Sequence, residues 1–376
     1  EVLEEEIVQT LLDIKEGKYS NILEDIDIEK EWKFLEEKKQ RSGRSSTYLS
    51  SKREFWTYGV AASIVLLISI TFVFNQTNQS PDFEAPIIVN NNIESGSDKV
   101  ILTLEDGSEV VLEKGTAYQT TNLTSNGQEI IYTTSNQQPG QASKNSPVDY
   151  FSEGTSRRTA YNTLTIPRGG QFYILLSDGT KVWLNSESQL KYPVAFNEGE
   201  TRQVELVYGE AYFDVSPSTN HKGANFKVSH SSQDVEVLGT EFNIKAYKGD
   251  TNIYTTLVEG KVAVSSASIK QNLVPNQQSN LDLQTNKMVI RIIEVSNIIS
   301  WRDGIFDFEG ESLKEIMKVL SRWYDMDIVF TNKDLGEEKF IGSFNKSLPI
   351  EEILSSIKNT NIIKNYEINN KTITLN

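Results

Sequence analysis

Two tripeptides place a carboxylate beside a hydroxyl and could in principle do chemistry. They are Asp-Gly-Ser at 106–108 and Asp-Gly-Thr at 178–180. Two such acids could form the carboxylate pair that general acid–base hydrolysis needs. However, Asx-Gly is favoured at the centre of a type I′ hairpin turn, and both tripeptides lie between apolar runs. We therefore interpret both as hairpin turns.

Other residues that could bind or react are few. Arg-Gly-Gly at 168–170 could cradle a phosphate, but it lacks the spacing and the lysine of a P-loop, so a structural turn is favoured. The chain has two histidines, His221 and His230, and no cysteine. A metal site would need further ligands, and Cys-ligated zinc, iron–sulfur clusters, disulfides and a thiol nucleophile are excluded. The sequence predicts no catalytic residue from motifs of this kind, no cofactor and no metal.

The overall charge limits the classes of molecule that the protein is expected to bind. The chain has 376 residues, 24% of them charged, and a formal net charge of −15. Nucleic-acid binding needs clustered Lys and Arg to displace counterions, so an acidic chain is a poor candidate for it. The length allows two or three domains with cores of their own.

One segment is predicted to cross a membrane. Residues 55–74 read FWTYGVAASIVLLISITFVF, which is 20 residues without a charge. A helix of this length covers about 30 Å, the thickness of the hydrocarbon core. The alternatives are a buried core helix and a signal peptide, but no small-residue cleavage site follows the segment. We therefore expect a transmembrane helix at 55–74.

The flanking charges give the orientation of this helix. Residues 38–53 contain six basic residues and no acid, whereas residues 75–98 contain four acids and no basic residue. The positive-inside rule places the N-terminus in the cytoplasm and the C-terminus in the periplasm. A DNA-binding patch is the alternative for the basic run, but its position next to the span favours the topological role. We expect a single-pass protein of the bacterial inner membrane.

The remaining regions follow from hydrophobic spacing. Residues 1–54 are expected to form a short helical cytoplasmic arm, and residues 75–97, which are rich in Asn and Ser, a periplasmic linker. From 98 to 300, short apolar runs alternate with turn signals, which predicts an all-β periplasmic domain, either a sandwich or a short β-solenoid. Residues 301–376 predict a C-terminal α+β domain in the order β-α-β-β-α-β-β, whose first helix has Leu313, Ile316, Met317 and Leu320 on its apolar face.

Five ordered blocks carry a resemblance to a known family. They read NTLTIPRGGQFYILLSDGTKVWLNSESQLKYPVAF, RQVELVYGEAYFDV, VEVLGTEFNIKAY, TTLVEGKVAV and WRDGIFDFEGESLKEIMKVLSRWYDMDI. In this order they resemble the FecR family of transmembrane anti-sigma factors, in the form associated with SusC/SusD-type uptake systems. Because five blocks at consistent spacing are more specific than one short motif, we extend the resemblance over roughly residues 100–376. The last block is similar to the family's usual C-terminal domain, which resembles the signalling modules of secretins and TonB-dependent receptors.

The resemblance implies a regulator and not a metabolic enzyme. A TonB-dependent receptor of the outer membrane would contact the C-terminal domain with its signalling domain, and the signal would reach an extracytoplasmic-function sigma factor in the cytoplasm. An exposed edge strand of the C-terminal domain could add to the receptor's sheet by β-augmentation. Direct contact with nucleic acid is not implied. The arm at 1–54 is shorter than the family's helical anti-sigma domain, so we expect it to be a truncated anti-sigma region.

The resemblance also singles out the bond between Gly239 and Thr240. Some FecR-type regulators cleave themselves at a Gly-Thr bond by an N-to-O acyl shift, in which the Thr hydroxyl attacks the preceding Gly carbonyl. This requires a strained peptide and a stabilised oxyanion, because an unactivated hydroxyl is a weak nucleophile. The alternative is that Gly239 permits a bulge and Thr240 suits a strand. Both residues are candidates for self-cleavage.

A different class of function remains as the alternative. The protein could be a membrane-anchored periplasmic binding or scaffold protein, for example for glycans. An exposed row of aromatic side chains on one sheet face would favour it, but we expect Trp183, Trp301, Trp323 and Tyr324 to be core residues instead.

Overall fold

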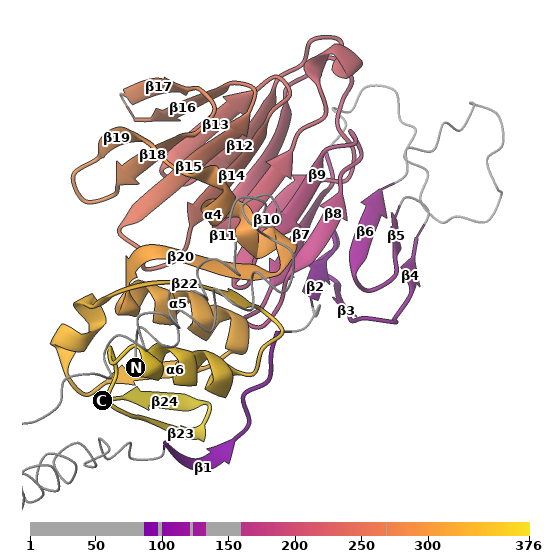
Figure 1. Cartoon of the computed structure of the whole chain (residues 1–376). Helices are drawn as coiled ribbons and strands as arrows, with labels where there is room; N and C mark the ends of the chain where they lie inside the picture. The colour runs from indigo at the N-terminus through magenta and orange to yellow at the C-terminus, as the bar shows by residue number, and fades with distance from the viewer. Residues whose placement is uncertain (1–85, 97–99, 121–122, 133–158, 268) are drawn as a thin grey trace, which may run out of the picture. The chain divides into compact units, whose positions relative to one another are not determined.

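The computed structural model describes residues 86–96, 100–120, 123–132, 159–267 and 269–376 (Figure 1). All of them belong to the second of two compact units, Asp82–Asn376. The predicted arm at 1–54 and the predicted transmembrane helix at 55–74 lie outside the described residues. Within the described ranges, no helix is long and apolar enough to cross a membrane.

In the described part of the chain, 18 strands form two sheets that share the long strand β11 (Arg202–Asp214). The first sheet has the order β3-β2-β7-β10-β11-β12-β13-β16-β17, with β2 at Val100–Thr103, β3 at Glu109–Leu112, β7 at Tyr161–Ile166, β10 at Ser188–Pro193, β12 at Phe226–His230, β13 at Gln233–Val237, β16 at Val262–Ser266 and β17 at Ile269–Leu273. The second has the order β4-β5-β6-β8-β9-β11-β14-β15-β18-β19, with β4 at Tyr118–Gln119, β5 at Leu123–Ser125, β6 at Glu129–Tyr132, β8 at Phe172–Leu175, β9 at Lys181–Leu184, β14 at Glu241–Ala246, β15 at Asn252–Glu259, β18 at Gln277–Asp282 and β19 at Lys287–Ile292.

The two sheets enclose one hydrophobic core. Buried side chains recur at every second position, as in β7, because successive side chains of a strand point to opposite faces. The chain winds by alternating sheets: hairpins β12–β13 and β16–β17 lie in the first, and β14–β15 and β18–β19 in the second. The prediction of an all-β domain is confirmed. Its two sheets form a sandwich, and the alternating hairpins give it the winding of a short solenoid.

Gly209 lies where β11 passes from the first sheet to the second. Residues before it pair with β10 and β12, and residues from Gly209 onward pair with β14. Its φ is 103°, and a Cβ there would lie 2.4 Å from Cα of Ser188. Only glycine fits this backbone and this contact, so the crossing depends on Gly209.

The C-terminal module, Ile305–Leu375, packs around a second core. In chain order it consists of β20 (Ile305–Ser312), α5 (Leu313–Tyr324), β21 (Asp327–Phe330), the 3-10 turn η4 (Lys333–Glu337), β22 (Lys339–Asn345), α6 (Ile350–Asn359), β23 (Tyr366–Asn370) and β24 (Thr372–Leu375). The four apolar residues predicted for the first helix are buried in this core. The strands form two sheets, β20–β22 and β1-β23-β24-β21. A short helix α4 (Val295–Ile299) and a 3-10 turn η3 (Ser300–Asp303) connect the module to β19.

Strand β1 (Ile87–Asn91) is an addition that the sequence did not predict. These residues fall in the segment 75–97, which we expected to be a periplasmic linker, yet they pair in parallel with β23. We predicted a linker because most residues of the segment are polar. Ile, Ile and Val in succession nevertheless favour a strand, and the edge of β23 offers unpaired backbone groups.

Both Asp-Gly turns are hairpin turns, at β2–β3 and β8–β9. Each glycine amide donates to the carbonyl three residues earlier at 2.9 Å, from Gly107 to Leu104 and from Gly179 to Leu176. Only the glycine has a positive φ, 83° and 81°. The loops are therefore type I turns followed by a left-handed glycine. The predicted type I′ is wrong because it needs two central residues at positive φ.

The two turns differ in what their carboxylates contact. Asp178 Oδ2 lies 2.8 Å from Arg202 Nη1, and both side chains are at most 2% exposed. The same guanidinium group donates to the carbonyls of Ser216 at 2.9 Å and Ala224 at 3.2 Å. Asp106 is exposed, and hydrogen bonds from the hydroxyl and amide of Ser108 lower its pKa. The carboxylates are structural, and only Asp178 holds a buried charge.

We predict that Asp178→Ala destabilises the protein, because it leaves the buried Arg202 guanidinium without its counter-charge. The expected loss in free energy of unfolding is about 3–5 kcal/mol. Asp106→Ala is the matched control, because it removes the same turn residue and its local hydrogen bonds from Ser108 without leaving a buried charge, so its unfolding midpoint should fall far less. Urea denaturation followed by circular dichroism measures both variants. Equal midpoints for the two variants would contradict the structural role of the pair.

Candidate functional site

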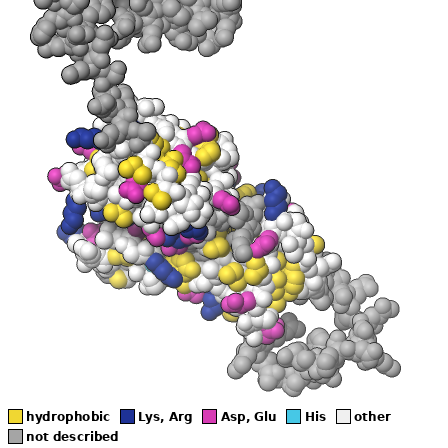
Figure 2. Space-filling view, turned by 90° about the horizontal axis from the view of Figure 1, so that it is seen from below, with side chains coloured by type: hydrophobic (Ala, Val, Ile, Leu, Met, Phe, Trp, Pro, Cys, Tyr) yellow, Lys and Arg dark blue, Asp and Glu magenta, His cyan; other side chains and the backbone are white. Residues whose placement is uncertain are grey.

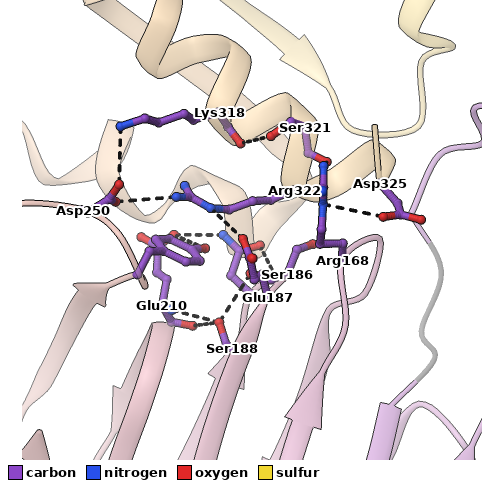
Figure 3. A network of polar contacts seen from close by, with 12 residues as sticks. Arg168, Ser186, Glu187, Ser188, Glu210, Asp250, Lys318, Ser321, Arg322 and Asp325 are labelled. Atoms are coloured by element: carbon purple, nitrogen blue, oxygen red, sulfur yellow. Dashed lines mark hydrogen bonds and ion pairs between the residues drawn. The ribbon is translucent and has the colours of Figure 1, made fainter. Parts of the chain in front are cut away.

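A polar junction joins the β domain to the C-terminal module (Figure 3). We define the junction by Arg168, Glu187 and Asp250 from the β domain and by Lys318, Arg322 and Asp325 from α5 and its C-cap. Arg168 follows β7, Glu187 precedes β10, and Asp250 lies in the turn between β14 and β15. Three separate turns of the sandwich therefore meet one end of one helix.

Arg322 makes the central contact. Its Nε lies 3.1 Å from Glu187 Oε2, and its Nη2 lies 3.6 Å from Asp250 Oδ2. Its guanidinium group stacks over the ring of Tyr247 at 3.6 Å from the ring centre. The side chain is only 11% exposed. Two carboxylates and one aromatic ring of the β domain thus surround one cation of the module, which makes the contact stronger than a surface pair.

Lys318 adds a second cation one helical turn earlier. Its Nζ lies 3.4 Å from Asp250 Oδ1 and 2.8 Å from Glu315 Oε1. Partial burial opposes the charge, but the hydrogen bonds and charges of Glu315 and Asp250 outweigh it and raise the pKa of Lys318. Lys318 therefore stays charged and shares Asp250 with Arg322.

The loop at 168–170 docks on the C-terminal end of α5. Arg168 Nη2 donates to the carbonyls of Ser321, at 3.0 Å, and Met326. Its Nε and Nη1 face the carboxylates of Asp325 and Asp327, at 3.5 and 3.3 Å. The amide of Gly169 donates to the carbonyl of Arg322 at 2.7 Å. Most of the donors that a phosphate would need are thus used within the chain, and the guanidinium group already faces two carboxylates. The interpretation as a turn is confirmed, and the turn supplies a cation and an amide to the carbonyls at the end of the helix.

A buried carboxylate lies beneath Arg322. Glu210 is 7% exposed and accepts from Asn185 Nδ2 at 2.9 Å, from Asn243 Nδ2 at 3.0 Å and from the Tyr247 hydroxyl at 3.4 Å. Burial, and then the charge of Glu210, raise the pKa of the Tyr247 phenol well above its ordinary value. Tyr247 therefore remains a donor to Glu210 while its ring carries Arg322. Through the Tyr247 ring and its hydroxyl, this network connects Arg322 to the buried Glu210 of the second sheet.

Cations also cover aromatic rings beside the junction. Arg302, in the connector η3, lies over Tyr212 at 4.4 Å and over Trp183 at 5.5 Å. Lys346 donates to Gln171 Oε1 at 2.6 Å and lies over the ring of Trp323 at 3.8 Å. Of the four aromatic side chains expected in the core, Trp301 and Tyr324 are buried, whereas Trp183 and Trp323 are only half-buried, with cations over their rings. The exposed row of rings that a glycan-binding face would need is not formed by these residues.

The junction is incompletely filled. A cavity of about 340 Å³ lies between Glu210 and Asn243 of the second sheet and Trp301, Ile305 and Ile316 of the connector and module. Two polar atoms of residues that line it, Asn243 Oδ1 and Trp301 Nε1, are among the buried atoms that find no hydrogen-bond partner in the described part of the chain. A polar contact that leaves such a hollow is less costly to separate than a packed core.

Gly239 and Thr240 lie away from the junction, in the turn between β13 and β14. Gly239 has a φ of 148°, and a Cβ there would lie 2.9 Å from Cα of Pro217. The Thr240 hydroxyl donates to the carbonyl of Lys261 at 3.0 Å, and Thr240 is 5% exposed. Among the described contacts, no carboxylate or imidazole bonds to this hydroxyl. Gly239 thus has a backbone conformation that residues with a side chain rarely adopt, and the hydrogen bond to Lys261 holds the Thr240 hydroxyl.

The two histidines make local contacts. His221 Nε2 lies 2.9 Å from Ser216 Oγ, and His230 Nδ1 accepts from the amide of Ser232 at 3.2 Å. Within the described ranges, no group of three or more His, Asp or Glu side chains is arranged to hold a metal ion.

Sequence reasoning missed the junction. Lys318 and Arg322 stand four residues apart beside the apolar face of α5, which is the only local signal. Glu187 gives none, although it takes a φ of 58° that non-glycine residues rarely adopt. A positive φ in a charged residue is visible only in the structure.

Comparisons with known proteins match both parts. A family model described as FecR protein matches residues 162–263, and one described as FecR, C-terminal matches residues 305–375. Among solved structures, two crystal structures of a "putative anti-sigma factor" from Parabacteroides distasonis ATCC 8503 are similar, at 27% and 26% identity with TM-scores of 0.52 and 0.51. Each match covers 57% of this chain and 98% of the other. No curated protein matches. Arg322 lies in one matched region and Glu187 in the other, so the junction joins them.

We predict that Arg322→Met uncouples the module from the β domain, since it removes the cation that Glu187 and Asp250 surround. The expected loss is about 2 kcal/mol, with separate unfolding transitions for the two parts in calorimetry. Lys222→Met is the control. It removes a cation whose pair with Glu198 has side chains 66% and 72% exposed, so a change within about 0.5 kcal/mol is expected. A single unshifted transition for Arg322→Met would show that the junction does not couple the parts.

Proposed function

We propose that this chain, whose residues 162–263 and 305–375 match the FecR and FecR C-terminal family models, is a FecR-type regulator of an extracytoplasmic-function sigma factor. In this proposal the protein spans the bacterial inner membrane once through residues 55–74. The C-terminal module receives a signal from a TonB-dependent receptor of the outer membrane, and residues 1–54 act on the sigma factor in the cytoplasm.

The observation that carries the proposal is the pairing of the two family domains through one polar junction. The likeness to the crystal structures of the anti-sigma factor extends over 98% of those chains, which supports a regulatory role. The net charge of −15 also favours protein partners over nucleic acid.

A relay needs an element with two arrangements whose balance a partner can shift. The junction is suited to this, because each side of it has a separate hydrophobic core. Opening it would expose charged groups that water can solvate, together with the apolar side chains that line the cavity, such as Trp301 and Ile316. A receptor that binds the C-terminal module more tightly in one arrangement would therefore shift the junction without unfolding either part.

The experiment compares transcripts of a receptor operon in the native bacterium with and without the gene for this chain. We expect the deletion to change both the basal level and the induced level, and the wild-type chain to restore them. A chain that lacks residues 301–376 should restore the basal level but lose the response to inducer, because the receptor's contact is gone. The Lys222→Met variant, with an intact junction, serves as the complementation control. If the transcripts of all strains respond identically, the proposed function is wrong.

The geometry at Gly239 supports a second proposal, that the chain cleaves itself before Thr240. The Thr240 oxygen would attack the Gly239 carbonyl carbon, the C–N bond would break, and the amine would take the hydroxyl proton. Water would then hydrolyse the resulting ester to release two fragments. The features that support this proposal are the Thr240 hydroxyl, which is held by the Lys261 carbonyl next to the Gly239 peptide, and the absence of a side chain at Gly239.

We predict that wild type from its own envelope runs as two fragments on a denaturing gel, the second of which begins at Thr240 by N-terminal sequencing. Thr240→Ala should remain full length because it lacks the nucleophile. Thr240→Ser keeps a hydroxyl and should still split. An uncleaved wild type, or a cleaved Thr240→Ala, would contradict this mechanism.

A further inference from the structure

Strand β1 holds an unusual position in the C-terminal module. It pairs with β23 across a sequence separation of about 280 residues, and it occupies an edge of the four-stranded sheet. The pairing is parallel, with an irregularity between Ile88 and Asn90. The strand therefore comes from outside the contiguous module and closes an edge that the module itself leaves open.

The strand buries little of its own surface. Ile87, Ile88 and Val89 are 56%, 49% and 64% exposed, although they are its most apolar residues. Figure 2 shows the molecule from below the view of Figure 1, where β1 and β23 lie lowest, and hydrophobic and acidic side chains are interspersed on the described surface. The backbone ladder and a few amide contacts hold β1, such as Asn90 Nδ2 to Asn370 Oδ1 at 3.1 Å. Ladders of this kind are exchangeable, because any extended chain can provide the same backbone groups.

The residues after β1 connect it to the junction. Ile93 is 9% exposed and belongs to the core of the module. Gly96 lies in so narrow a space that a Cβ would be 2.7 Å from the Gly169 carbonyl oxygen and 2.8 Å from the Trp323 ring. Gly169 in turn donates to the Arg322 carbonyl. Residues 87–96 thus run from the sheet edge to the loop that docks on α5, and we call them the strap.

We propose that β1 is a placeholder, and that the β23 edge accepts in its place a parallel strand from a partner protein. The proposal rests on the proposed function, in which the module receives a periplasmic partner. The partner's strand would be extended, uncharged and apolar, with amide side chains toward its C-terminal end, because β1 itself reads IIVNN and meets Asn369 and Asn370 there.

Other edges of the module are less suited to a relay. β21 and both strands of the β20–β22 sheet also have one side without a partner strand among the described residues, but a strand added there would leave the strap in place. Replacement of β1 would instead release Ile93 and Gly96 from their contacts. The signal would then reach the loop at 168–170 and the junction through a continuous series of packed residues.

The test uses the whole 376-residue chain and a fluorescent synthetic peptide of residues 86–94 as the probe. In the opened variant, Ile87–Asn91 is replaced by Gly-Ser-Gly-Ser-Gly, which keeps the length and removes the strand. In the locked variant, Asn90→Cys and Asn369→Cys form a disulfide between residues that are register partners. The chain has no native cysteine, so the disulfide is unambiguous. Ala263→Cys with Asn272→Cys, partners in the β16–β17 hairpin, is the control disulfide.

We expect the peptide to bind the opened variant at least roughly tenfold more tightly than wild type, because β1 no longer occupies the edge. The locked variant should not bind until it is reduced, and the control disulfide should bind as wild type does. Equal binding to opened and locked variants would overturn the proposal. So would a wild-type dimer in light scattering that exchanges β1 between copies, because the partner would then be a second copy of this chain. Neither result depends on the receptor. Failure of the strand-exchange proposal would therefore leave the proposed function to be tested by the transcript experiment.

Discussion

The C-terminal end of α5 is the point on which the arrangement depends. The last carbonyls of a helix lack partners within the helix and carry partial negative charge. Here the β domain supplies the partners, through the Arg168 guanidinium group and the Gly169 amide. The same turn of the helix sends Arg322 back between two carboxylates of the β domain. The β domain thus provides hydrogen-bond donors for the helix carbonyls, and the helix provides a cation for the carboxylates of the β domain. These two sets of contacts hold the parts together.

The character of this contact differs from that of the cores on either side. The sandwich core and the module core consist of aliphatic and aromatic side chains with little exposure. The junction consists of ion pairs, an aromatic stack and a partly empty cavity. When an ion pair separates, water solvates both charges again, and this offsets part of the lost attraction. When an apolar core is exposed to water, no such compensation occurs.

The sequence predicts what depends on period and local turn chemistry. The apolar face of α5 from Leu313 to Leu320 follows from helical spacing, and the Asp-Gly hairpins follow from turn preference. The turn type was wrong because the bulge depends on the register of the flanking strands. The strand β1 and the pair of Glu187 with Arg322 could not be predicted, since both depend on contacts between residues more than 100 positions apart. The type of a single residue does not indicate which distant residue it contacts.

The partial exposure of the apolar side chains of β1 has an energetic meaning. Exchange of one parallel strand for another conserves the number of backbone hydrogen bonds, so the difference in free energy comes from side chains. Since Ile87, Ile88 and Val89 remain about half exposed or more, β1 gains little from them in its present place. A partner strand that belongs to a folded domain would bring further contacts around the same ladder. The weakness of β1 as a packed element is thus what makes it replaceable, while Ile93 and Gly96 make its replacement consequential for the rest of the chain.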